Sequence, residues 1–187
     1  MINFIFNNKI YQSSIQAFKK YSDYFSNQHN HDNQEIYELL DNQDYPNLPE
    51  EVFRQFIKYF EEGYIEITNS NVFYLYYLSE RYNFASLKTT INKYIDDNSI
   101  NIINYYLPIY IQENEITNSS HFEPLLSKHL IEIVTDDRLL QLPISNIHRI
   151  LAQYFKMYEV REANIEDNKL IIDFVMKYVE ARGPQAS

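Results

Sequence analysis

The stretch Leu48–Ile67, LPEEVFRQFIKYFEEGYIEI, decides the fold of the first half of the chain. Pro49 suits the first position of a helix, and the two acidic residues after it complement the positive end of the helix dipole. Apolar side chains then recur at helical spacing: Val52, Phe53, Phe56, Ile57 and Phe60. Gly63 stands where a left-handed residue commonly ends a helix. The stretch therefore predicts an amphipathic helix, followed by a short alternating strand at Tyr64–Ile67.

Strands and short helices are expected before this stretch. Two strands, Ile2–Phe6 and Lys9–Gln12, flank Asn7-Asn8, and asparagine tolerates the positive φ of a two-residue hairpin turn. Ser13 and Ser14 offer N-caps for the segment that follows. The further elements expected are a helix at 15–22, a helical turn at 23–25 and a strand at 35–40.

Only helices are expected in the second half. After helices at 71–81 and from 85 to about 95, Asp96-Asp97-Asn98-Ser99 breaks the pattern and marks a domain boundary. Pro108 is expected to end or kink the next helix. Long amphipathic helices are predicted at 122–134, 144–154 and 170–179. The last is expected to bury Leu170, Ile171, Phe174, Val175, Tyr178 and Val179. The fold class is thus α+β, with a small α/β domain at 1–98, an all-helical domain at 99–181 and a polar tail at 182–187.

The composition narrows the classes of partner and location. The chain has 187 residues and a formal net charge of −10, with no basic stripe, so we expect neither nucleic-acid nor membrane binding. It has no cysteine, which excludes disulfides, thiolate metal sites and cysteine nucleophiles. No signal peptide or apolar run of about 20 residues is visible. We therefore expect an intracellular protein, cytoplasmic or nuclear.

Enzymatic chemistry finds little support in the sequence. Only two glycines occur, too few for a phosphate-binding loop or a dinucleotide fingerprint. Paired acids lie at predicted helix ends, where capping explains them, and no serine has the glycine frame of a nucleophile elbow. His29, His31 and Asp32 form the best metal-like cluster, although a polar loop tip explains them more simply. We expect no enzyme, no catalytic residue and no cofactor, and keep a metal protein as an alternative.

The first hundred residues resemble a BTB/POZ domain. Ile10–Phe25 resembles that family's strand and helix ending in Ser-x-Tyr-Phe, Leu48–Ile67 its helix, glycine and short strand, and 71–87 its helix pair. The rest is similar to a BACK domain, the helical region that often follows BTB. The segment Phe122–Leu151 carries this second resemblance, and Leu170–Val179 resembles the next helix.

The resemblance implies a protein-interaction module. BTB domains self-associate or bind other proteins, and BTB–BACK proteins commonly act as substrate adaptors of cullin-3 ubiquitin ligases. The implied function is that of a protein–protein interaction adaptor or scaffold. If the partner is a cullin-3-type ubiquitin ligase, the chain would be its substrate adaptor. The protein-binding residues that it implies are Phe25, Phe60, Glu61, Glu62 and Tyr64.

Departures from the family pattern leave two alternatives open. The family's dimer interface uses a helix before the first strand, whereas this sequence begins on that strand, so a monomeric elongin-C/Skp1-like adaptor is one alternative. Glu61-Glu62 replaces the usual Tyr-Thr before the glycine, and no hydrophobic-x-Glu motif follows Phe25. The other alternative is therefore a structural oligomerisation module with no ligase role.

Overall fold

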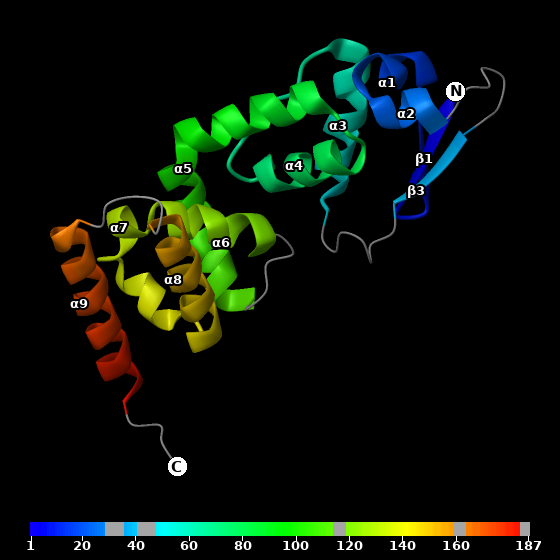
Figure 1. Cartoon of the computed structure of the whole chain (residues 1–187). Coiled ribbons are helices and arrows are strands. Elements are labelled where there is room, and N and C mark those ends of the chain that lie inside the picture. Colours follow the sequence, from blue (N-terminus) through cyan, green and yellow to red (C-terminus); the bar gives the residue numbers. More distant parts are fainter. Residues whose placement is uncertain (29–35, 41–47, 114–118, 159–163, 184–187) are drawn as a thin grey trace. The chain divides into compact units, whose positions relative to one another are not determined.

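The computed structural model describes residues 1–28, 36–40, 48–113, 119–158 and 164–183. Within these ranges the chain is mostly helical and carries a small sheet (Figure 1). The expected α+β class is confirmed at this coarse level. The chain divides into two compact units, Met1–Asn98 and Ser99–Ser187, called unit 1 and unit 2 below.

Unit 1 contains the sheet and the helices packed around it. Its elements are, in order, β1 (Ile2–Phe6), β2 (Lys9–Ser13), α1 (Ile15–Tyr21), α2 (Asp23–Gln28), β3 (Ile36–Leu40), α3 (Glu50–Glu62), α4 (Val72–Arg81) and the first part of α5 (Ala85–Glu113). The strand order is β2-β1-β3. The central strand β1 pairs antiparallel with β2 and parallel with β3.

The predicted hairpin is confirmed. Phe6 pairs with Lys9 across the turn, and Asn7 and Asn8 have φ values of 51° and 60°. Positive φ at both central residues is the conformation whose twist matches that of the flanking strands. The turn therefore fixes the register that turns Ile2, Phe4 and Phe6 into the core.

Helix α3 supplies the centre of an aromatic core. It spans Glu50–Glu62, its predicted apolar stripe is buried, and Gly63 ends it with a φ of 74°. The rings that meet around it come from β1, α1, α2, α3 and the turn between α4 and α5: Phe4, Phe18, Phe25, Phe53, Phe56, Phe60, Tyr82 and Phe84. Burial of each such ring contributes about 1.5–3 kcal/mol, so this cluster is the main stabilising feature of unit 1.

The strand predicted at Tyr64–Ile67 does not form, so that prediction was wrong. The segment has no ladder partner among the described residues. A side chain binds its backbone instead: the Glu66 carbonyl within the segment accepts from Asn71 Nδ2 at 2.9 Å, and the Thr68 amide just after it donates to Asn71 Oδ1 at 2.7 Å. Alternation of apolar residues cannot reveal such a competing hydrogen-bond partner.

Helix α5 continues past Pro108 to Glu113, so the proline does not end it. The one residue inside α5 with non-helical dihedrals is Asn98, with φ −126° and ψ 18°, which lies at the division between the units. Buried apolar side chains occur on both sides of the proline: Ile102, Ile103, Tyr106, Leu107 and Tyr110. Their burial offsets the hydrogen bond that proline removes, which costs about 3 kcal/mol.

Unit 2 is helical throughout its described part. After the end of α5 come α6 (Ser119–Lys128), α7 (Leu130–Ile133), the 3₁₀ helix η1 (Asp137–Gln141), α8 (Ile144–Tyr158) and α9 (Ile165–Arg182). The single helix expected at 122–134 is two helices, because His129 adopts φ −108° and ψ 19° between them. None of the helices in the described ranges is both long and apolar enough to span a bilayer.

The burial expected for α9 is only partly right. Ile171, Phe174 and Tyr178 are buried, but the other three apolar residues of the expected set are not. Leu170, Val175 and Val179 are 38%, 36% and 62% exposed. The helix has apolar residues on two faces, and periodicity alone could not tell which face would meet the core.

Candidate protein-interaction surface

Two of the five predicted binding residues lie in the core and cannot touch a partner. Phe25 is fully buried and stacks on Tyr82 with ring centroids 5.4 Å apart. Phe60 packs against Phe18 and Phe84, each at 4.2 Å between centroids. These two phenylalanines therefore belong to the core beneath the surface. Of the predicted binding residues, only Glu61, Glu62 and Tyr64 remain candidates for contact with a partner.

Glu61, Glu62 and Tyr64 are exposed at the C-terminal end of α3, and we call them the α3-end surface. Tyr64 is 70% exposed, which is high for an aromatic side chain. The amide of Gly63 donates to the Tyr59 carbonyl at 2.8 Å, so the helix ends in a closed turn between the acids and the tyrosine. Glu61 accepts a hydrogen bond from Ser13 Oγ at 2.7 Å, which ties this end of α3 to β2.

The segment after Tyr64 is held by Asn71, whose role the sequence did not reveal. Besides its bonds to Thr68 and Glu66, Asn71 donates to Gln55 Oε1 of α3 at 3.4 Å, and its side chain is almost entirely buried. Tyr94 of α5 adds a hydrogen bond to Asn69 Oδ1 at 2.9 Å. Asparagine at the start of a predicted helix is typical of a cap, but the Asn71 side chain makes no capping bond to α4, and its bond back to α3 is visible only in the structure.

A charged cluster at the other end of α3 joins the helix to the hairpin. Glu50 accepts from Lys9 Nζ at 2.7 Å and from Arg54 Nη2 at 2.9 Å. The hydrogen bond from Lys9 is the main cause that lowers the pKa of Glu50 to about 2. The cluster is open to solvent. Because it joins β2 to α3, we interpret it as a structural contact between the two elements.

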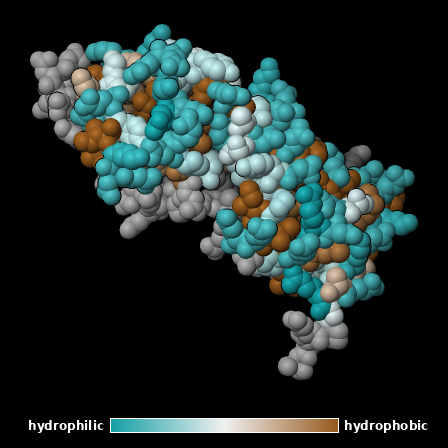
Figure 2. Space-filling view, turned by 180° about the vertical axis from the view of Figure 1, so that it is seen from behind, coloured by the Kyte–Doolittle hydropathy of each residue, from teal (hydrophilic) through white to brown (hydrophobic). Residues whose placement is uncertain are grey.

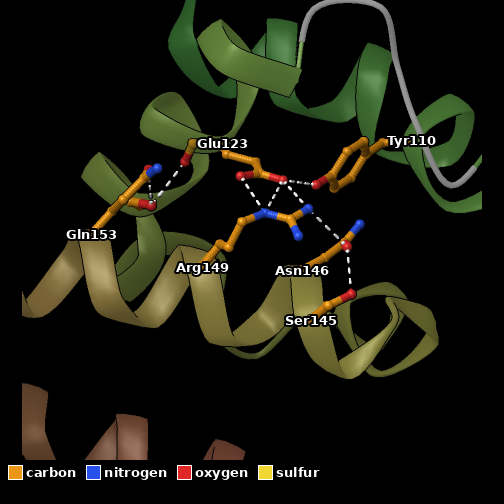
Figure 3. A network of polar contacts seen from close by, with 7 residues as sticks. Tyr110, Glu123, Ser145, Asn146, Arg149 and Gln153 are labelled. Atoms are coloured by element: carbon orange, nitrogen blue, oxygen red, sulfur yellow. Dashed lines mark hydrogen bonds and ion pairs between the residues drawn. The ribbon is translucent and has the colours of Figure 1, made fainter.

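Unit 2 contains a partly buried ionic network on three helices (Figure 3), in which Glu123 is buried and Arg149 is half exposed. Glu123 of α6 accepts from Arg149 of α8, with Nε 3.0 Å from Oε2 and Nη2 2.7 Å from Oε1, and also from the Tyr110 hydroxyl of α5. Arg149 donates as well to Asn146 Oδ1 at 2.9 Å. Burial, together with the bond to Glu123, raises the pKa of Tyr110. These groups satisfy one another, so we interpret them as a structural link between α5, α6 and α8.

A cavity of about 260 Å³ lies in unit 2 where α9 meets η1. Leu140, Leu170 and Phe174 give it an apolar lining, and the ion pair of Lys177 with Asp137 stands at the same place. Pockets that hold drug-sized ligands are commonly about 300–1,000 Å³, so this one falls below that range.

The residues of the metal hypothesis, His29, His31 and Asp32, lie outside the described ranges. Elsewhere, in the part of the chain that the structure describes, no group of three His, Cys, Asp or Glu side chains is arranged to hold a metal ion.

No protein-family model matches this chain, and no curated protein matches its sequence. The BTB–BACK resemblance thus rests on the quoted sequence segments alone.

Proposed function

We propose that this chain is a protein-interaction adaptor or scaffold of the BTB–BACK type rather than an enzyme. The observation that supports the proposal is the α3-end surface: an exposed Tyr64 beside Glu61 and Glu62. Tyrosine is enriched in interface hot spots, because it brings a large apolar area with few rotatable bonds and a polar tip.

Rigidity of the surface adds to this support. The aromatic core lies beneath the end of α3, Gly63 closes the helix, and Asn71 holds the segment that follows. A partner that binds here orders few additional groups, so less of the contact energy is spent on conformational entropy. The partner that suits the surface is a protein with Lys or Arg side chains around a shallow apolar pocket.

The finer proposal is that this partner is a cullin-3-type ligase scaffold, with the chain as its substrate adaptor. Titration of cullin-3 by calorimetry tests it. We expect binding that Tyr64→Ser weakens about tenfold or more, as for a hot-spot tyrosine. Tyr105→Ser is the matched control, since Tyr105 is 44% exposed in unit 2. Absence of both heat and co-elution at micromolar protein would eliminate the ligase version and leave the broader adaptor proposal to other partners.

A structural oligomerisation module without ligase role is the second candidate. The exposed apolar side chains of α9 favour it over the monomeric elongin-C/Skp1-like adaptor. Light scattering coupled to size exclusion separates the two, because only the former predicts a mass that rises with protein concentration.

A further inference from the structure

Helix α9 packs on unit 2 through one face only. Ile171, Phe174 and Tyr178 form that face, and the Tyr178 hydroxyl donates to the Leu142 carbonyl at 2.7 Å. Arg182 bonds to the same carbonyl, and Lys177 pairs with Asp137. These contacts fix the rotation of the helix about its axis, so its remaining faces have defined directions. In Figure 1, α9 lies at the edge of unit 2.

A second apolar face of α9 is exposed. We call it the α9 stripe, and its members are Ile165, Ile172, Val175, Met176 and Val179, which are 84%, 60%, 36%, 57% and 62% exposed. At about 100° per residue they fall within one third of the helix circumference, next to the buried face, and Asn168 lies within the same sector. Hydrophilic and apolar surfaces alternate over the molecule (Figure 2), but a stripe with helical spacing is the pattern that marks a helix-packing face.

The charges beside the α9 stripe are complementary under a two-fold axis. Lys169 and Glu180 are eleven residues apart, close to three full turns, so they lie on the same flank of the stripe. When two copies of α9 run antiparallel about an axis near Val175, Lys169 of each copy faces Glu180 of the other. In a parallel pair this flank would lie on opposite sides of the contact in the two copies, so Lys169 and Glu180 would not meet across it. The flank therefore selects the antiparallel arrangement.

We propose that two copies of this chain associate through the α9 stripe, by antiparallel packing of α9 on α9. The contact is isologous, because the same residues contribute from both copies. It does not depend on the partner proposed for the α3-end surface. A single helix pair buries less than the roughly 800 Å² per partner of a standard interface, so we expect a weak dimer that dissociates on dilution.

Sedimentation equilibrium of the full chain over about 1–200 µM tests this proposal. We expect a monomer–dimer equilibrium, which Ile172→Glu weakens more than tenfold because it buries a charge at the centre of the contact. Lys169→Glu and Glu180→Lys should each weaken it about tenfold, since each turns two attractions into repulsions. The double variant Lys169→Glu/Glu180→Lys should return to within about threefold of the unmodified chain.

The double variant Lys169→Glu/Glu180→Lys distinguishes a specific contact from non-specific hydrophobic association. A chain that stays monomeric over the whole range, an Ile172→Glu variant that still dimerises, or a double variant without recovery would each overturn the proposal. Tyr64→Ser should leave the dimer unchanged, and a loss of dimer in that variant would place the interface in unit 1 instead. Conversely, Ile172→Glu should still bind any partner of the α3-end surface, so the two proposals fail independently.

Discussion

At the scale of single residues, a buried residue can join helices that lie far apart in the sequence, as Glu123 does in unit 2. Glu123 is 5% exposed, yet its carboxyl group accepts hydrogen bonds from both Arg149 and Tyr110. A buried carboxylate is tolerated only when hydrogen bonds replace its water shell. None of these three residues stood out in the sequence, because their separation along the chain hides their contact.

Replacement of Glu123 by alanine is therefore predicted to lower the free energy of unfolding by about 2 kcal/mol, since it leaves the buried Tyr110 hydroxyl without its acceptor and removes the ion pair with Arg149. Urea unfolding followed by circular dichroism measures this. The matched control is Glu132→Ala on α7, an exposed carboxylate that pairs with His129, where the loss should stay below about 1 kcal/mol. Equal losses in the two variants would show that the network is not a stabilising link.

Glu50 gives unit 1 a defined response to acid. Its pKa is about 2 in the folded protein against an ordinary 4.5, so it stabilises the fold fully above pH 4.5. That stabilisation is lost as the pH falls from 4.5 toward 2, because the carboxylate must then accept a proton and release Lys9. Thermal melts of the chain and of Glu50→Gln should differ at pH 7 and converge near pH 2. A difference that does not change with pH would contradict the role given to the ion pair.

At the scale of the elements, the sequence predicts turns and helix ends that depend on neighbouring residues. It does not predict features that depend on side-chain contacts formed in the folded chain. The hairpin turn at Asn7-Asn8 and the helix ended by Gly63 follow from short-range backbone chemistry, and both were found. The segment Tyr64–Ile67 was wrongly predicted as a strand, and the break at His129 was missed. Asn71 binds the backbone at Glu66 and Thr68, and the alternation of apolar residues does not reveal such a side-chain partner. The candidate site shows the same limit: its aromatic signal included the buried Phe25 and Phe60 together with the exposed Tyr64.

The segment after α3 provides a test at this scale. Asn71→Ala should cost about 2 kcal/mol of stability, since it leaves the Thr68 amide and the Glu66 carbonyl without their partner. Hydrogen exchange should speed up at Thr68, while amides inside α4 stay protected. Asn69→Ala is the control, because it removes only the bond from Tyr94. Unchanged exchange at Thr68 would show that Asn71 does not hold the segment.

At the scale of the whole molecule, each unit has its own candidate binding surface above a packed core. Unit 1 carries the α3-end surface, and unit 2 carries the α9 stripe. Neither uses a cofactor or a catalytic residue in the function we propose. The net charge of −10 favours partners with basic surfaces, so binding at the α3-end surface should weaken as salt screens Glu61 and Glu62. An intracellular location stays a prediction from the sequence.

Co-purification from cells that produce the chain naturally tests most directly whether it works as a binding protein through the α3-end surface. The unmodified chain, Tyr64→Ser and Tyr105→Ser are each captured under the same conditions, and the proteins bound to them are compared. We predict at least one protein that the unmodified chain and Tyr105→Ser retain in equal amount and that Tyr64→Ser loses. The same set of bound proteins for all three forms would contradict the proposed function of this surface.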